Sequence, residues 1–305
     1  MPSINANDIS IAYQIYGIES SLGNTTQTKP WVVLVHGLGV SLAGWPTPLI
    51  DHLVANGFAV LTFDNRDCGQ SEILAQYRPP SLAWLLLKSR IGFNPSAPYK
   101  LIDMATDTIC LLDALNIKAA HIVGVSMGGM ISQLIAIHYP TRVLSLSSIM
   151  STTGRRSLPS AKTPIVKHLI SKPVSDSLDD RMAYHIKKWR LIGSPKYPSS
   201  EQRLIEIIQK QFDRGLSIDG TKRQSAAILA APSRVNALQS LQTPTLVIHG
   251  SSDPLVPIKC GIDTAENIKG ARLEIIEGMG HDFPEALIDK IALLVSQHIL
   301  TKGSY

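Results

Sequence analysis

The chain has 305 residues, of which 44% are hydrophobic, and a formal net charge of +5 at pH 7. This length fits one large α/β domain or a core domain with an insertion, and the apolar content is sufficient for a sizeable core. The basic residues are spread along the chain without a Lys/Arg block interleaved with aromatic residues, which argues against a nucleic-acid partner.

The first 150 residues alternate between predicted strands and helices. Residues 9–16 alternate apolar and polar side chains, which predicts an early antiparallel strand, and residues 18–30 form a polar turn region. Residues 31–35 are continuously apolar, as in a parallel strand buried on both faces. Further strands are predicted at residues 58–63, 121–125 and 143–149, with helices at 45–56, 101–115 and 130–138 and a less regular stretch at 72–100.

The alternation stops at residue 150 and resumes near residue 242. Residues 151–241 are basic, interrupted by prolines and apolar at helical spacing, which predicts a helical cap. The last part of the chain predicts strands at 245–248 and 272–276 and helices at 259–268 and 284–300. We therefore expect a mostly parallel sheet flanked by helices, with a core domain of residues 1–150 and 242–305 and a cap of residues 151–241.

The number and spacing of the cysteines and the lack of long apolar runs indicate in which cellular compartment the protein is expected. The three cysteines are odd in number and widely spaced, which argues against a disulfide framework and fits a reducing environment. The N-terminal residues 1–17 lack a charged region followed by an apolar run, and no stretch reaches the length of a membrane span. We expect a cytoplasmic protein without a membrane-spanning segment.

The segment Gly124-Val-Ser-Met-Gly128 lies between an apolar strand and a helical pattern. Strand, tight turn and helix with a serine at the apex is the nucleophile elbow. The turn strains the serine backbone, so residues two positions away must be nearly free of side chains, and Gly124 and Gly128 meet this need. Ser126 is therefore the predicted nucleophile.

Two further strand ends carry residues that complete a catalytic triad. Asp253 follows the strand at 245–248 and His281 follows the strand at 272–276. The order Ser, Asp, His along the chain is the order of elbow-type hydrolases. His281 would remove the proton of Ser126, and Asp253 would hold the histidine tautomer and stabilise the imidazolium.

The tetrahedral oxyanion needs preorganised donors, for which the backbone N–H groups of Leu38 and Met127 are the candidates. His36 and His249 are expected to brace turns instead. Asp64 and Asp67 are rival acids, but they precede the serine, and their loop is interpreted as a turn braced by Arg66. Asp282 is expected to cap the last helix. An apolar acyl site is expected from Leu38, Val40, Trp45, Met127 and the cap residues Ile165, Leu169, Trp189 and Leu191.

The chain resembles α/β-hydrolase-fold serine hydrolases over nearly its full length. The resemblance is carried by His36-Gly-Leu-Gly, Asp64-Asn-Arg-Asp-Cys-Gly-Gln-Ser71, Gly124-Val-Ser-Met-Gly-Gly129, His249-Gly-Ser-Ser-Asp253 and Gly280-His281. It especially resembles bacterial carboxylesterases and the aclacinomycin methylesterase-like branch, although Cys68 departs from the threonine of that branch. The resemblance implies an α/β-hydrolase fold with a helical cap inserted after the sixth strand, and neither metal nor organic cofactor.

These residues predict a carboxylic ester hydrolase that acts through an acyl-enzyme on small, largely apolar esters of short to medium chain. Dehalogenases and epoxide hydrolases of similar fold use an aspartate where Ser126 stands, so they are excluded. Cofactor-free perhydrolases, lactonases and carbon–carbon bond hydrolases share the triad and stay open. A non-enzymatic receptor with a hydrolase fold is the alternative of another class, and turnover of any activated ester would exclude it.

Overall fold

The computed structural model describes residues 2–18, 29–90 and 96–301 of the chain, so most of the polar turn predicted at 18–30 and part of the stretch 72–100 lie outside it. Within these ranges eight strands form one sheet in the order β1-β2-β4-β3-β5-β6-β7-β8. The strands are β1 (Ser3–Ala6), β2 (Ile9–Tyr16), β3 (Trp31–Val35), β4 (Ala59–Phe63), β5 (Ala120–Val125), β6 (Val143–Ile149), β7 (Thr245–Gly250) and β8 (Arg272–Ile276).

The sheet is antiparallel at one edge and parallel elsewhere. β2 pairs antiparallel with both β1 and β4, whereas β3 to β8 are all parallel. Every residue of β4, β5 and β7 is buried. The continuous apolar runs in the sequence predict this burial, because such runs are typical of strands covered on both faces. Because these strands are parallel, their carboxyl ends meet at one edge of the sheet, where functional groups gather.

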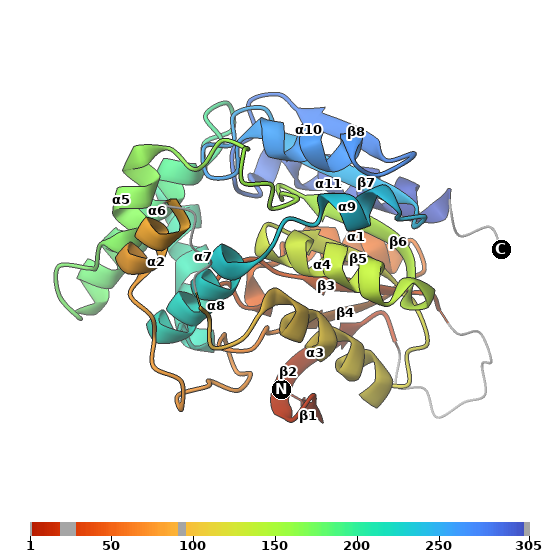
Figure 1. Cartoon of the computed structure of the whole chain (residues 1–305), viewed down its shortest axis with the longest axis horizontal. Coiled ribbons are helices and arrows are strands. Elements are labelled where there is room, and N and C mark those ends of the chain that lie inside the picture. Colours follow the sequence, from red (N-terminus) through yellow and green to blue (C-terminus); the bar gives the residue numbers. More distant parts are fainter. Residues whose placement is uncertain (1, 19–28, 91–95, 302–305) are drawn as a thin grey trace.

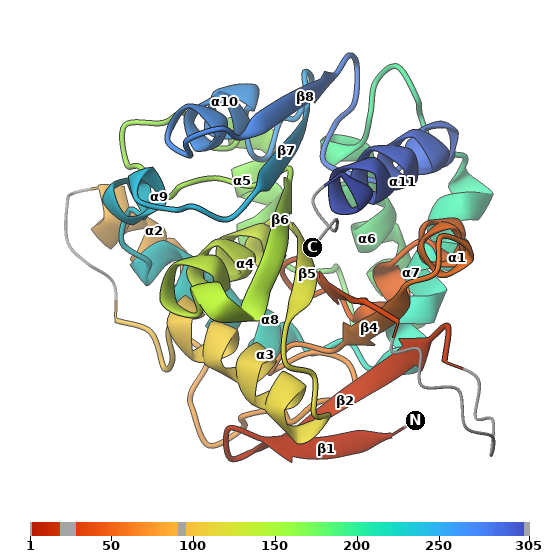
Figure 2. The ribbon, with the colours of Figure 1, turned by 90° about the vertical axis from the view of Figure 1, so that its right-hand side faces the viewer.

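Helices cover both faces of the sheet, as Figure 2 shows. α1 (Thr47–Ala55) and α11 (Glu285–Leu300) lie on one face, and α3 (Leu101–Ala114), α4 (Met127–His138), α9 (Val235–Gln239) and α10 (Ile258–Glu266) lie on the other. Each face has its own cluster of buried apolar side chains, with Leu49 and Ile291 in one and Leu111 and Ile131 in the other. Short 3-10 helices occur at Leu42–Gly44 (η1) and Pro140–Arg142 (η2).

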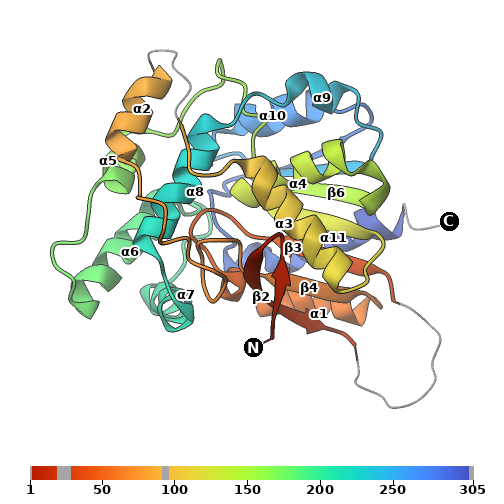
Figure 3. The same ribbon diagram turned by 60° about the horizontal axis from the view of Figure 1, so that its bottom comes forward.

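Between β6 and β7 the chain leaves the sheet and forms α5 (Thr163–Ile170), α6 (Leu178–Ile192), α7 (Glu201–Arg214) and α8 (Ile218–Ala230) before α9. These four helices gather at one end of the sheet together with α2 (Leu82–Arg90), as Figures 1 and 3 both show. We call α5 to α8 the cap helices. The assignment of residues 151–241 to a separate cap domain stays a prediction.

The predicted α/β-hydrolase architecture is confirmed, and the insertion follows β6. The sequence patterns did not single out three of the α-helices, α2, α8 and α9. The α8 sequence IDGTKRQSAAILA has no clear apolar stripe, and its buried positions include Arg223 and Gln224, whose polar groups are satisfied by distant partners. In the described part of the chain, no helix combines the length and apolar character that crossing a bilayer requires.

Candidate active site

Ser126 lies in a strained turn between β5 and α4. Its backbone has φ 56° and ψ −118°, outside the regions that side-chain-bearing residues favour. A Cβ on Gly124 would clash with Ser132 and the Gly128 carbonyl, and a Cβ on Gly128 would clash with the Val35 carbonyl. The two glycines therefore allow β5, α4 and the end of β3 to approach closely enough to present Ser126 at the sheet edge.

The structure brings the three predicted triad residues together. The Oγ of Ser126 lies 3.0 Å from Nε2 of His281, and Nδ1 of His281 lies 2.7 Å from Oδ2 of Asp253. The other carboxylate oxygen of Asp253 accepts the N–H groups of Leu255 and Val256 at 2.9 and 2.8 Å. These two hydrogen bonds fix the orientation of the carboxylate toward the histidine.

The predicted oxyanion donors lie beside Ser126. Met127 is the first residue of α4, so its N–H belongs to the unsatisfied end of the helix. The His36-Gly-Leu-Gly loop packs against the elbow, because a Cβ on Gly37 would lie only 3.2 Å from Cβ of Ser126. Gly39 N–H donates to the side chain of Gln224 at 2.8 Å, which ties this loop to α8. The role of the Leu38 and Met127 N–H groups stays a prediction.

His36 and His249 make the loop contacts that were predicted for them. Nδ1 of His36 accepts the Gly37 N–H at 2.7 Å, and Nε2 of His249 lies 2.8 Å from the Val256 carbonyl. Burial lowers the pKa of His36 to about 4 and also lowers the pKa of His249. Both rings are therefore neutral at pH 7.

The expectation that Asp282 caps the last helix is wrong. The residue preceding α11 is Pro284, whereas Asp282 accepts a 2.5 Å hydrogen bond from the hydroxyl of Ser194. Burial raises the pKa of the Asp282 carboxyl. The Ser194 hydroxyl also accepts the Gly280 N–H at 2.8 Å, so this cluster links the segment after α6 to the loop that carries His281.

The loop that contains Asp64 and Asp67 was expected to be a turn braced by Arg66. Arg66 ties this loop to α3 through a buried bidentate pair with Asp107, at 2.5 and 2.6 Å. The two loop aspartates are not part of the triad geometry, and the structure gives them other partners.

Those partners are arginines of the cap helices. Arg214 of α7 lies 2.8 Å from Asp64, and Arg223 of α8 lies 2.6 Å from Asp67, with side chains that are almost completely buried. The thiol of Cys68 lies between these pairs in sequence, and burial raises its pKa. The Asp64–Asp67 loop therefore anchors the cap helices to the sheet, and Cys68 is a protonated, buried side chain.

A cavity of about 2240 Å³ opens between the cap helices and the sheet edge. Ser126 and His281 line it, and so do the predicted pocket residues Leu38, Val40, Trp45, Leu169 and Trp189. Met127 is fully buried, and neither it nor Ile165 is among the residues that line this cavity. The volume exceeds the roughly 300–1,000 Å³ of most small-molecule sites.

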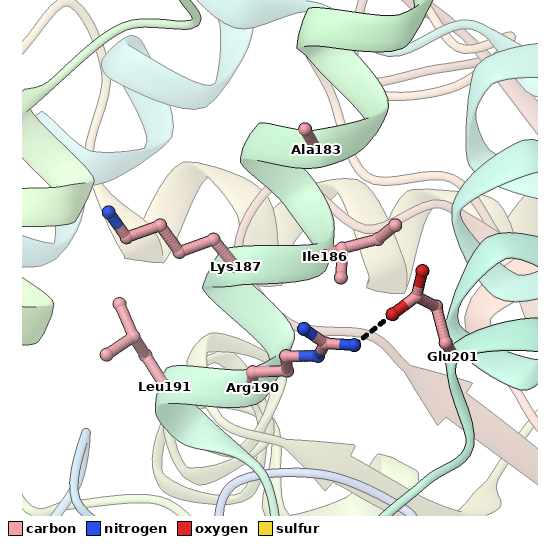
Figure 4. A pocket seen from close by; sticks show the side chains of 6 residues that line it. All are labelled: Ala183, Ile186, Lys187, Arg190, Leu191 and Glu201. Atoms are coloured by element: carbon pink, nitrogen blue, oxygen red, sulfur yellow. Dashed lines mark hydrogen bonds and ion pairs between the residues drawn. The ribbon is translucent and has the colours of Figure 1, made fainter.

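Leu191 was predicted to face this cavity and does not. It lines a separate hollow of about 450 Å³ on the outer side of α6, shown in Figure 4. Lys187 and Arg190 also line this outer hollow, where Arg190 pairs with Glu201 of α7. Lys188, by contrast, lines the large cavity, which the helical pattern of α6 did not reveal.

The fold and the geometry of this site are those of a hydrolase, and comparison with known proteins identifies the family. A family model for the alpha/beta hydrolase fold matches residues 30–285. The chain therefore belongs to the α/β-hydrolase fold family, in agreement with the resemblance of its motifs.

Two curated relatives cover most of the chain. A rhodomycin D methylesterase from Streptomyces sp. strain C5 is 28% identical, over 88% of this chain and 90% of the relative. A 3-oxoadipate enol-lactonase from Acinetobacter baylyi is 24% identical, over 90% of this chain and 88% of the relative. Among solved structures, a meta-cleavage product hydrolase from Pseudomonas fluorescens has a TM-score of 0.74 at 19% identity, covering 99% of this chain and 98% of its own. That likeness supports the fold.

Proposed function

We propose that this protein is a serine carboxylic ester hydrolase that acts through an acyl-enzyme on short- to medium-chain, largely apolar esters. The observation that carries the proposal is the hydrogen-bonded chain from Ser126 through His281 to Asp253, with Ser126 and His281 lining the large cavity. The methylesterase and lactonase relatives both hydrolyse ester bonds by name, which supports the same reaction class.

Acylation begins when the Ser126 oxygen attacks the ester carbonyl carbon and His281 accepts its proton. The carbonyl oxygen becomes an oxyanion, which the N–H groups of Leu38 and Met127 stabilise; one such donor is worth about 3–4 kcal/mol. The carbon–oxygen bond to the alcohol then breaks, and His281 returns the proton to the departing alcohol. Asp253 holds the histidine and stabilises its charged form.

Deacylation repeats these steps with water. His281 removes a proton from a water molecule, whose oxygen attacks the acyl carbon and forms a second oxyanion in the same donor site. Collapse releases the carboxylic acid and returns the proton to the Ser126 oxygen. No other co-reactant is consumed.

The wall of the cavity supports the apolar substrate class. Trp45, Leu169 and Trp189 contribute apolar surface, and each methylene that they bury gains about 0.8 kcal/mol. Activity is therefore expected to rise with acyl length until the apolar part of the cavity is filled, and to fall for long-chain, triglyceride-like substrates.

Hydrolysis of a lactone is a second candidate, because it uses the same bond changes and one curated relative is named an enol-lactonase. The two candidates differ only in whether the leaving oxygen stays attached to the acyl group. Perhydrolysis and carbon–carbon bond cleavage on the same triad are tested beside them.

The experiment is an acyl-chain series of 4-nitrophenyl esters assayed beside lactones, a carbon–carbon cleavage substrate and a peroxide reaction. We expect the highest kcat/KM on a short or medium ester. Leu169→Ser and Trp189→Ala should move the preferred chain length while acetyl ester hydrolysis is largely kept. Absence of turnover on every ester and lactone would contradict the proposal.

A further inference from the structure

Lys188 lies on the inner side of α6 and lines the cavity above Ser126. Its side chain is half-buried, and Nζ lies 5.0 Å from the ring centroid of Trp189, within the range of a cation–π contact. The preceding residue, Lys187, is exposed and faces the outer hollow of α6 (Figure 4). Of these two adjacent lysines of α6, Lys188 therefore faces the large cavity and Lys187 faces the outer hollow.

Several other basic residues that line the cavity have acidic partners. Arg223 pairs with Asp67, Lys222 with Asp219, and Arg155 with Asp263, at 2.6, 2.7 and 2.8 Å respectively. Lys172 and Lys210 are exposed to solvent. Arg181 stacks on Phe212.

Like Arg181, Lys188 has an aromatic ring as its neighbour and, within the described ranges, no acidic side chain within 4 Å of its charged group. Of the two residues, Lys188 is the one whose charge acts on His36, beside the elbow.

Lys188 also lies close to the loop beside the elbow. Its positive charge contributes to lowering the pKa of His36, the residue that precedes the glycine packed against Ser126. It has the same effect on His168 of α5 and His185 of α6. Because burial and this charge keep these rings neutral at pH 7, none of the three histidines competes with Lys188 for an anion.

An ammonium group in an apolar-walled cavity loses part of its hydration, and an unpaired cation there is costly. Burial accordingly lowers the pKa of Lys188 to about 8, so that the group is still about nine-tenths protonated at pH 7. A carboxylate entering the cavity would restore the lost interactions of this cation. A single ammonium group matches one negative charge, and its hydrogen bonds to a carboxylate are charge-assisted.

We propose that Lys188 is a specificity-determining residue that binds a carboxylate of the substrate, so that the preferred substrates are otherwise apolar esters bearing one free carboxylate. This inference rests on the proposed ester hydrolysis, because it places the carboxylate in the same cavity as Ser126. It adds a charged recognition point to a site whose sequence motifs carry no basic cluster.

The experiment compares pairs of esters that differ only in charge. Mono(4-nitrophenyl) adipate and 4-nitrophenyl hexanoate place the carboxylate or a methyl group on the acyl side. 4-(Hexanoyloxy)benzoate and its methyl ester place the difference on the alcohol side. The wild type, Lys188→Met, Lys188→Arg and the matched control Lys187→Met are assayed for kcat/KM on all four.

In at least one pair, Lys188→Met should lower kcat/KM for the charged ester by about 10- to 100-fold and change the neutral ester by less than about threefold. Lys188→Arg should keep part of the preference, and Lys187→Met should leave it unchanged. Equal losses on both members of each pair, or no loss on either, would overturn the inference. Circular dichroism checks folding, and Lys188→Gln replaces Lys188→Met where the latter does not fold.

A binding measurement separates this inference from the proposed reaction. Ser126→Ala is titrated calorimetrically with the same pairs, so no turnover is needed. We expect tighter binding of the charged member, and loss of that difference in Ser126→Ala/Lys188→Met. If the wild type is inactive but Ser126→Ala still binds the charged ester more tightly, the proposed ester hydrolysis is rejected and the carboxylate-binding role of Lys188 is kept. If the wild type hydrolyses esters but Ser126→Ala binds the charged and the neutral member of each pair equally, the hydrolysis is kept and the role of Lys188 is rejected.

Discussion

The main-chain N–H of His281 donates a 2.7 Å hydrogen bond to the main-chain carbonyl of Ile192, the last residue of α6. The base of the proposed triad is thus held by the end of a cap helix as well as by Asp253. A change in the position of this helix would therefore be transmitted to the histidine, which makes the junction between α6 and the His281 loop a sensitive part of the site.

Gly280→Ala tests this junction. The added methyl would lie 2.6 Å from the Ile192 carbonyl oxygen and would also press on Gly193, so His281 should be displaced from Ser126. Because a misplacement of about 1 Å can cost about 100-fold in rate, we expect kcat to fall by at least tenfold. Gly270→Ala is the control for backbone strain without a clash. Its φ of 75° makes the substitution strained, but a Cβ there meets nothing within 4 Å, so kcat should be kept. Equal kcat values for the two variants would contradict the coupling.

Ser126→Ala should abolish nearly all ester turnover and all covalent labelling by a fluorophosphonate probe, because the attacking oxygen is removed. The exposed Ser157 is outside the cavity lining, so Ser157→Ala should retain both. Mass spectrometry of the labelled protein identifies the modified residue. Persistent labelling of a folded Ser126→Ala protein would show that another residue is the nucleophile.

Asp253→Asn should lower kcat by about 10⁴-fold, because the amide would hold the imidazole of His281 in the wrong tautomer. Asp282→Asn should be far milder, since Asp282 bonds to Ser194 and not to the histidine ring. Steady-state kinetics of the two variants decide the matter. Severe loss in Asp282→Asn together with near-normal activity in Asp253→Asn would require the two roles to be exchanged.

Arg223→Met should destabilise the fold, because it leaves Asp67 charged and buried without its ion-pair partner. The free energy of unfolding should fall by about 3–5 kcal/mol, measured by urea denaturation. Arg190→Met removes an exposed pair with Glu201 and should cost less than about 1 kcal/mol. Recovery of stability in Arg223→Met/Asp67→Asn would identify the stranded charge as the cause, whereas a loss no larger than that of Arg190→Met would argue against it.

The preference for a charged ester should depend on pH through Lys188. Its pKa of about 8 means that the cation is present below this pH and is lost as the pH rises through it. The ratio of kcat/KM for charged over neutral ester should therefore fall between about pH 7 and 9.

Taking the ratio cancels every pH effect on the catalytic step that the charged and the neutral ester share. Other charged or titratable groups near Lys188 do not account for a fall in this window. The lowered pKa values of His36, His168 and His185 keep these rings neutral throughout it. The other charged side chains nearby are those of Arg181 and Lys187. A ratio that stays flat from pH 7 to 9, or one that falls equally in Lys188→Met, would contradict the prediction.

The sequence alone was sufficient to predict the architecture and the meeting of Ser126, Asp253 and His281 at one edge of the sheet. Strand 143–149 and strand 272–276 were predicted with the bounds that the structure has. Local patterns explain this success: a parallel strand buried on both faces is continuously apolar, and the elbow needs small residues at fixed spacing around Ser126. Because the carboxyl ends of parallel strands share one edge, the topology then implied that Asp253 and His281 lie near Ser126.

Only the tertiary structure decided which distant side chains meet. Asp67 pairs with Arg223, 156 residues later in the chain, and Asp282 with Ser194, where local patterns suggested a braced turn and a helix cap. Whether Lys187 or Lys188 faces the cavity depends on the rotation of α6 about its own axis. That rotation is set by packing against neighbouring helices, and a helix with charged residues around much of its surface carries no local signal for it.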